Sequence, residues 1–137
     1  MKCRTIEHTA DIGIEVEACS LEDLFAGAAT GMFSLIVDPA TVLPGAPREV
    51  ALEAGDLEEL LFKWLNELLY LLGAEGLLVS RIRVHRVEGL RIEASVWGEP
   101  ADPTRHQALE EIKAATYHDM RVEHREDGWF ARIIFDV

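Results

Sequence analysis

Two short segments at opposite ends of the chain carry acidic groups that could hold a cation. Asp11 lies in the run His8-Thr9-Ala10-Asp11-Ile12-Gly13-Ile14, and the sequence closes on Phe135-Asp136-Val137. The Asp136 side chain and the terminal carboxylate of Val137 sit on adjacent residues, and Asp11 beside them would add a third anionic group. Carboxylate oxygens held this closely repel one another unless protons or a cation intervene, and hard divalent cations such as Ca²⁺ and Mg²⁺ take such ligands. The chemistry that these residues suggest is therefore the binding of a divalent metal ion.

Each of these residues also has a purely structural interpretation. Asp11 precedes Ile12-Gly13, where glycine relaxes the backbone, so its carboxylate either projects from a turn between strands or hydrogen-bonds its own turn. His8 either orients Asp11 or serves as a structural hydrogen-bonding residue at a strand end. Neighbouring side chains of a strand point to opposite faces, so Asp136 and Val137 bring their carboxylates together only if the strand bends or ends there.

A second polar run, Lys113-Ala114-Ala115-Thr116-Tyr117-His118-Asp119, lies in apolar surroundings. A partly buried Lys113 would need a carboxylate partner or a lowered pKa, so it could balance a carboxylate cluster, bind an anionic ligand or act as a base. His118 and Asp119 could orient metal ligands from a strand end. The remaining histidines have no metal-ligand spacing, and we expect them to be solvated; they are His85, His106 and His124.

Charge and composition narrow the classes of function. The chain has 25 acidic and 13 basic residues and a formal net charge of −12, so it offers little material for a cationic surface, and we expect no direct binding to nucleic acid. Arg81 and Arg83 alternate with apolar residues and are typical of the solvent face of a strand. The global charge suits a cation or a basic protein partner and does not choose between them.

Cellular location and redox state follow from what the sequence lacks. No apolar stretch reaches the roughly 20 residues that a membrane-spanning helix needs. The N-terminal residues have no apolar secretory core, so we expect a cytoplasmic protein. Cys3 and Cys19 form neither a zinc spacing nor a disulfide framework and are expected to be thiols.

Hydrophobic periodicity predicts two helices among several strands. The first helix begins after an N-cap at Ser20, runs to about Val37 and contains Gly27 and Gly31, which indicate close packing of another backbone. The second begins after an N-cap at Asp56, with Glu59 as the other half of a capping box, and ends at Gly73. Strands are predicted over 3–7, 12–18, 48–53, 77–87 and 89–98 and within 110–137, around a turn at Glu126-Asp127-Gly128.

These elements predict a single α+β domain over residues 1–137. The most economical arrangement packs both helices on one face of a largely antiparallel β-sheet. The order of the strands is not determined by the sequence.

Taken together, the segments resemble the archease family over nearly the whole chain. The residues that carry the resemblance are His8-Thr9-Ala10-Asp11-Ile12-Gly13, Leu21-Glu22-Asp23-Leu24-Phe25, Leu60-Leu61-Phe62-Lys63-Trp64-Leu65-Asn66-Glu67, Ile112-Lys113-Ala114-Ala115-Thr116-Tyr117-His118 and Phe135-Asp136-Val137. Each motif alone is weakly specific, but their order, spacing and placement in a chain of this size are specific together. Ala115 stands where a branched residue is often found, a departure of little expected consequence.

The resemblance implies a small accessory protein of an RtcB-type RNA ligase rather than an enzyme. Members of the family promote guanylylation of the ligase and support its multiple turnover in tRNA splicing or RNA repair. The resemblance also implies a divalent metal, commonly calcium, held by Asp11, Asp136 and Val137. Lys113 and His118, together with His8, would belong to the same functional surface.

Three other functions remain open on the sequence. The first is a stand-alone small metal-dependent hydrolase with His8 or His118 as base, although no phosphate loop or nucleophile motif is present. The second is a general chaperone-like module, which would need a large exposed apolar patch. The third is an interaction domain that binds no metal.

Overall fold

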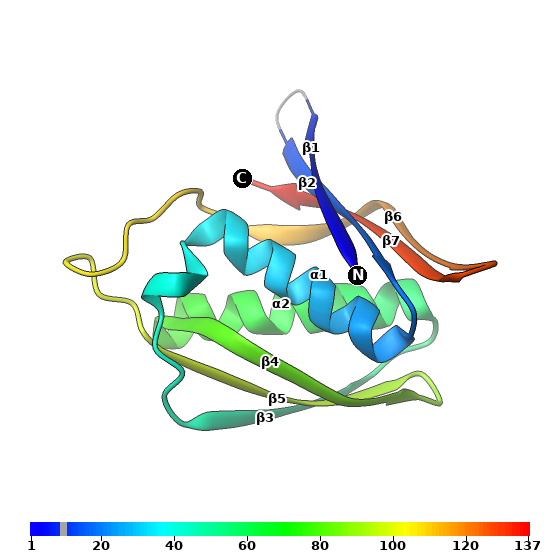
Figure 1. Cartoon of the computed structure of the whole chain (residues 1–137), viewed down its shortest axis with the longest axis horizontal. Helices are drawn as coiled ribbons and strands as arrows, with labels where there is room; N and C mark the ends of the chain where they lie inside the picture. Colours follow the sequence, from blue (N-terminus) through cyan, green and yellow to red (C-terminus); the bar gives the residue numbers. More distant parts are fainter. Residues whose placement is uncertain (9–10) are drawn as a thin grey trace.

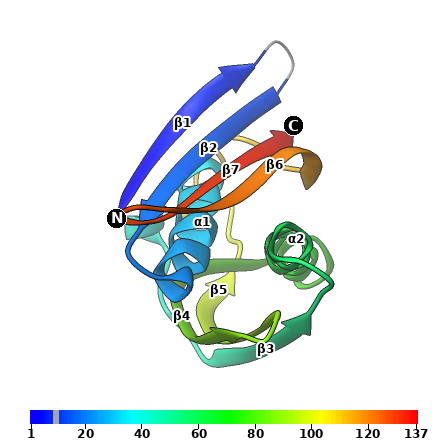
Figure 2. The same cartoon turned by 90° about the vertical axis from the view of Figure 1, so that its right-hand side faces the viewer.

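The computed structural model describes residues 1–8 and 11–137, and in it two helices lie between two antiparallel sheets (Figure 1). One sheet has the strand order β1-β2-β7-β6, and the other has the order β3-β5-β4. Figure 2 shows both helices in the space between the sheets, with α2 seen end-on, so the molecule has three layers. The elements are β1 (Lys2–His8), β2 (Asp11–Ala18), α1 (Leu21–Ile36), η1 (Pro39–Thr41), β3 (Pro47–Glu53), α2 (Leu57–Glu75), β4 (Leu77–Glu88), β5 (Arg91–Pro100), β6 (Ala114–Arg125) and β7 (Gly128–Asp136).

The predicted α+β class, with two helices and largely antiparallel strands, is confirmed. The strands divide into two sheets, however, and the helices are covered on two sides. Two sheets cover the helices because the apolar residues of the helices occupy more than one narrow face. On α1 the buried residues are Leu24, Phe25, Gly27, Ala28, Ala29, Met32, Phe33 and Ile36, which face both sheets. A helix that is apolar on more than one face needs a second layer to remove that surface from water.

The predicted helix N-termini are confirmed. Ser20 Oγ accepts a hydrogen bond from the Asp23 N–H at 3.1 Å, and Asp56 Oδ1 accepts one from the Glu59 N–H at 2.8 Å. The Glu59 carboxylate reaches back as predicted, but it accepts from the N–H of Gly55, one residue before the cap. Both caps satisfy amide groups that the first helical turn leaves without a partner.

The predicted end of α2 at Gly73 is wrong. The helix continues to Glu75, and Gly76 ends it with φ 69°, a left-handed conformation that glycine adopts without a steric cost. The Gly76 N–H returns to the carbonyls of Leu71 and Leu72.

Close packing at the two glycines of α1 is confirmed, but the neighbours are side chains rather than a backbone. A Cβ at Gly27 would clash with Met1 Sδ, and one at Gly31 would lie 2.7 Å from Cys3 Sγ. The absent side chains let α1 approach the start of the chain and β1.

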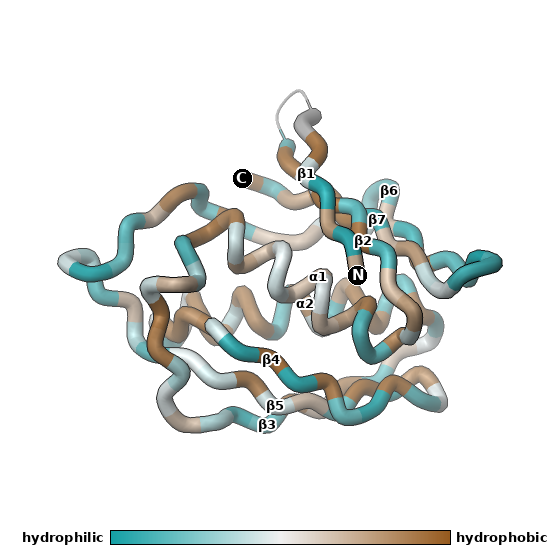
Figure 3. The backbone as a smooth tube through the Cα atoms, in the orientation of Figure 1, coloured by the Kyte–Doolittle hydropathy of each residue, from teal (hydrophilic) through white to brown (hydrophobic). Residues whose placement is uncertain are grey.

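The strands separate polar and apolar residues by alternation, which Figure 3 shows along β4. Within the described residues, neither helix combines the length and the apolar character that crossing a membrane requires.

Candidate metal site

The predicted meeting of Asp11 and Asp136 occurs through strand pairing. β2 begins where β7 ends, and the two strands run antiparallel with Asp11 directly opposite Asp136. Asp136 is also opposite Ala114 of β6, so three strands converge at this point. Side chains of directly opposed residues lie on one face of a sheet, with Cβ atoms about 4.5–5.5 Å apart. The first and last segments of the chain are thus joined in one cross-strand row.

This row lies on the outer face of its sheet. Because side chains alternate, Ile14, Ile133 and Phe135 point inward and are fully buried against the helices. Asp11 and Asp136 have the opposite parity and face solvent; Asp136 is exposed and Asp11 is partly exposed. Figure 2 shows the C-terminus beside the start of β2 at the upper end of the sheet.

Gly13 allows close packing within β2. It lies within β2, opposite Ile6 on one side and Ile134 on the other. A Cβ at Gly13 would stand 2.7 Å from the Ile133 carbonyl oxygen and 2.8 Å from Cδ1 of Ile134. The side chains of Ile6 and Ile134 therefore pack over Gly13 and form an apolar cluster two residues from Asp11.

The end of the chain is anchored beside these carboxylates. The side chain of Val137 packs against the hydrophobic core and is partly buried. One residue earlier, the Asp136 carbonyl accepts a hydrogen bond from the Lys113 N–H at 2.8 Å. These contacts hold the chain at Asp136 and at the residue after it.

Asn66 of α2 holds β6 in place next to the site. Its Nδ2 donates to the Ala115 carbonyl at 3.0 Å, and its Oδ1 accepts from the Ala115 N–H at 3.0 Å. β6 is an edge strand, so these two backbone groups point away from β7 and would otherwise lack a strand partner. One side-chain amide thus replaces a neighbouring strand where β6 faces Asp136.

Asp11 and Asp136, which we call the acidic row, have no positively charged partner among the contacts of the described residues. No described lysine, arginine or histidine side chain forms an ion pair with Asp11 or Asp136. Two carboxylates on opposed residues repel when both are ionised. An external cation would remove that repulsion.

The donor set could supply only part of the coordination of a hard divalent cation. Within the described residues, no three histidine, cysteine, aspartate or glutamate side chains gather as a metal site, so the two aspartates stand as a pair. A main-chain oxygen of Val137 is the next donor along the strand. Calcium takes about six to eight oxygen ligands, so water or a partner protein would supply the others.

The other predicted residues of this surface have different outcomes. The backbone of His8 pairs with Asp11, but its side chain lies outside the part of the chain that the structure describes. The predicted partial burial of Lys113 is wrong, because its side chain is exposed and only its N–H contacts Asp136. His118 is 80% exposed, and its Nε2 lies 3.4 Å from Oδ2 of Asp119. A functional role for these three residues stays a prediction.

His118 and Asp119 lie in an irregular part of β6. The register between β6 and β7 shifts between Thr116 and Arg121, and Asp119 has a positive φ of 56°. The irregularity accommodates extra residues, of which Tyr117, His118 and Asp119 are exposed and Met120 is buried.

Sequence reasoning missed two polar residues that shape this end of the molecule. Asn66 is a polar residue beside the apolar stripe of α2, which was the available signal for a structural role. His106 was expected to be solvated, and that prediction is wrong: its side chain is only 3% exposed and contacts Glu99. Its proximity in sequence to Glu99, Asp102 and Arg105 was the signal for a buried polar network.

Residues 4–137 match the model of the Archease protein family (MTH1598/TM1083). The chain is 44% identical to protein archease of Thermococcus gammatolerans over 135 residues, which cover 96% of this chain and 95% of that protein. It is 43% identical to protein archease of Methanopyrus kandleri over 141 aligned residues, which cover 100% of both chains.

Two solved structures share the fold. The solution structure of Methanobacterium thermoautotrophicum protein 1598 superposes with a TM-score of 0.83 at 27% identity and covers 98% of each chain. The crystal structure of a Thermotoga maritima protein described as an archease and possible chaperone gives a TM-score of 0.65 at 25% identity, with coverage of 100% of this chain and 98% of that one.

Proposed function

This chain belongs to the archease family, and we propose that it activates an RtcB-type RNA ligase through a divalent metal ion bound at the acidic row. The protein would promote guanylylation of the ligase and support its multiple turnover in tRNA splicing or RNA repair. The metal ligands would be Asp11, Asp136 and a main-chain oxygen of Val137, and Ca²⁺ is the ion expected.

The observation that carries this proposal is the pairing of Asp11 with Asp136 on an exposed sheet face. The two residues come from opposite ends of the sequence, yet the register of β2 and β7 places them opposite each other. A partly coordinated ion at such a position can be shared with a second protein, because its remaining ligand positions point outward.

The proposed mechanism is one of docking and electrostatics. The ion-bearing end of the sheet would approach the metal- and phosphate-binding centre of the ligase and rearrange or deliver metal there. Asn66 and the Lys113 N–H would hold β6 and β7 at a fixed separation, so that the carboxylates keep their geometry when the ion is bound.

The test is a guanylylation assay with a cognate ligase, GTP and metal, with and without this protein. Asp11→Ala is expected to lower the activation by about tenfold or more, the effect that loss of a supporting metal interaction typically has. Glu126→Ala, in the exposed turn between β6 and β7, is the matched control and should activate normally. Unchanged activation by the Asp11→Ala variant would remove the acidic row from the mechanism.

The same preparation distinguishes the other functions that the sequence leaves open. A stand-alone hydrolase would turn over phosphoester substrates with Mg²⁺ or Mn²⁺ in the absence of any ligase. A general chaperone would suppress aggregation of unrelated proteins, and its effect would survive Asp11→Ala. The proposed activator should do neither.

A further inference from the structure

A pocket of about 410 Å³ opens where the ends of the two helices meet the loop between β5 and β6. Its floor is apolar and consists of Ile36 and Val37 at the end of α1, Leu72 of α2, Leu78 of β4 and Ile112 of the loop. Most of these side chains are buried, so the floor is an opening in the core rather than an exposed patch.

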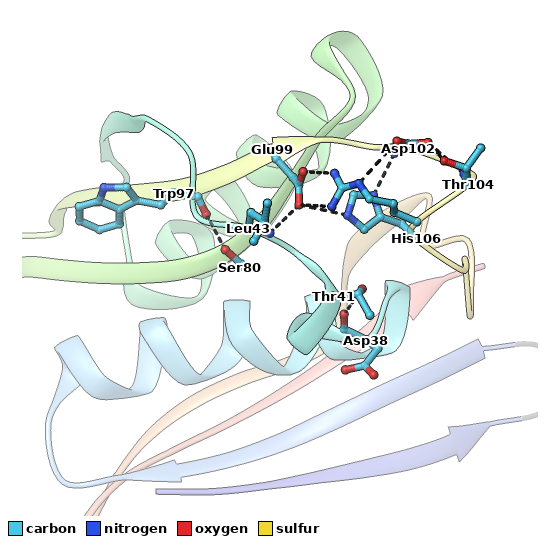
Figure 4. A network of polar contacts seen from close by, with 10 residues as sticks. Asp38, Thr41, Leu43, Ser80, Trp97, Glu99, Asp102, Thr104 and His106 are labelled. Carbon is cyan, nitrogen blue, oxygen red and sulfur yellow. Dashed lines mark hydrogen bonds and ion pairs between the residues drawn. The ribbon is translucent and has the colours of Figure 1, made fainter.

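The loop that forms the mouth is held by a polar network centred on the largely buried side chains of His106 and Glu99 (Figure 4). The Asp102 N–H donates to Nδ1 of His106 at 2.9 Å, so the ring proton lies on Nε2, which donates to Glu99 at 3.2 Å. The Glu99 carboxylate also accepts from the Arg105 guanidinium and from the Leu43 N–H. Every member of the network has a partner, which makes the loop a fixed wall.

Backbone hydrogen bonds fix the loop at both ends. The Ala101 N–H donates to the Gly76 carbonyl at 2.7 Å, and the Leu109 N–H donates to the Ile36 carbonyl at 2.9 Å. Ala108 forms an isolated bridge with Val37. The pocket is therefore formed before any ligand binds, and binding would cost little conformational entropy of the loop.

The mouth of the pocket is acidic. Glu110 and Glu111 stand at its edge with exposed side chains, and neither forms an ion pair with any described residue. Asp102 adds a third carboxylate, which is partly neutralised by Arg105 at 3.6 Å. No lysine or arginine lines the pocket. The mouth thus combines an apolar opening with negative charge, on a chain whose net charge is −12.

We propose that this pocket is a docking site for a basic segment of a partner protein, which inserts one aliphatic or aromatic side chain and places lysine or arginine beside Glu110 and Glu111. An apolar anchor fits the floor, and cationic neighbours fit the mouth. An anchor in a preformed pocket with charges at its rim is a common arrangement of short protein-binding segments. The proposal does not depend on the metal site.

A fluorescence-anisotropy assay with the full chain in EDTA tests this site. The probe is a set of ten-residue peptides with a central Leu, Phe, Met or Trp flanked by lysine and arginine. Two matched sets carry glutamate at the flanks or alanine at the centre. Basic peptides with an apolar centre are expected to bind at least about tenfold more tightly than either matched set, a difference of about 1.4 kcal/mol.

Variants locate the binding. The double substitution Glu110→Lys with Glu111→Lys should weaken the best peptide about tenfold or more. Ala108→Trp, which adds a bulky side chain at the exposed edge of the pocket, should do the same. The matched control is Glu88→Lys with Glu126→Lys, which changes the net charge equally at exposed positions away from the pocket. Circular dichroism and thermal melting confirm that each variant is folded.

Two results would overturn the proposal. One is the absence of preference for the basic peptides with an apolar centre. The other is equal weakening by the control pair, which would reduce the binding to general attraction by the acidic chain. Failure of ligase activation with intact peptide binding would instead count only against the proposed function.

Discussion

Two cross-strand rows on the same sheet face differ in whether their carboxylates are paired with positively charged side chains. In one row Glu15 of β2 lies between Arg4 of β1 and Arg132 of β7, and it accepts hydrogen bonds from both. Four residues along the same strands, Asp11 and Asp136 face each other with no described cation beside them.

The comparison separates a structural charge from one available for binding. Arg4 and then Arg132 hold the pKa of Glu15 below its ordinary value, so this carboxylate is satisfied within the fold. The acidic row has the same strand pairing without the arginines: Asp136 takes the place of Arg132, and His8, whose side chain lies outside the described part of the chain, takes the place of Arg4. The sheet can neutralise a carboxylate when its sequence supplies a partner, and at Asp11 and Asp136 the sequence supplies a second carboxylate. That contrast is why we propose that the acidic row binds an external ion.

The largest expected effect comes from placing an arginine in the acidic row, as in the row of Glu15 and Arg132. Asp136→Arg would place a guanidinium opposite Asp11, as Arg132 stands opposite Glu15. Calcium affinity should fall by about 100-fold or more, because one ligand is lost and a positive charge enters the site. Stability in EDTA should be unchanged or higher. Thermal melting with and without calcium measures both, since a ligand that binds only the folded state raises the melting temperature.

Asp136→Asn is the companion variant, because it removes the charge with little change of shape. A calcium-dependent rise in melting temperature that survives in both variants would contradict the assignment of the ion to this row.

The next prediction concerns the close packing around Gly13, two residues from Asp11. Gly13→Ala would press a methyl group against the Ile133 carbonyl at 2.7 Å, and backbone cannot yield as a flexible side chain can. We expect a loss of about 1–3 kcal/mol, the usual cost of overpacking. Urea unfolding measures it. Gly73→Ala is the control, because nothing lies within 4 Å of a Cβ there, and helix propensity should make it neutral or stabilising. Equal effects in the two variants would exclude the proposed packing role.

A smaller effect is expected from Asn66. Asn66→Leu would remove both hydrogen bonds to Ala115 and leave its N–H and carbonyl without the amide partner, at a cost of about 1–2 kcal/mol. Asn66→Asp should cost part of this, because it keeps an acceptor for the N–H but loses the donor. Calcium affinity should fall modestly in the same order. Amide hydrogen exchange at Ala115 gives a direct readout, and unchanged protection there would refute the pairing.

The smallest effect concerns the loop network, a third arrangement in which a carboxylate is fully satisfied. Arg105 first, and then the Leu43 N–H, lower the pKa of Glu99 from 4.5 to about 2. The folded pKa is below the unfolded one, so the stabilisation is present above about pH 4.5 and is lost as the pH falls toward 2. Glu99→Gln should therefore flatten the pH dependence of unfolding in this window. Glu126→Gln should leave it unchanged, and identical profiles for wild type and Glu99→Gln would contradict the network.

Local signals in the sequence were sufficient for much of the fold. The caps at Ser20 and Asp56 were predictable because they depend on residues within one helical turn. The wide apolar faces of the helices were also evident, but their meaning was not. Whether such a face is covered by one sheet or by two depends on pairings between distant strands, and periodicity does not reveal which strands pair.

For the candidate site, too, local signals could be read from the sequence and long-range pairings could not. The acidic residues could be selected by type, but their meeting depends on the register of β2 against β7, which a shift of one residue would reverse from one face to the other. His106 was misjudged because its burial comes from a loop without periodicity, where contacts to Glu99 and Asp102 decide the environment.

The most direct test of the central claim is a crystal structure grown with Mn²⁺ in place of calcium, with anomalous differences measured at the manganese edge. The account predicts one strong peak bonded to a carboxylate oxygen of Asp11 and one of Asp136, and no peak there in the Asp136→Arg variant. A peak elsewhere, or none while both carboxylates are ordered, would contradict it.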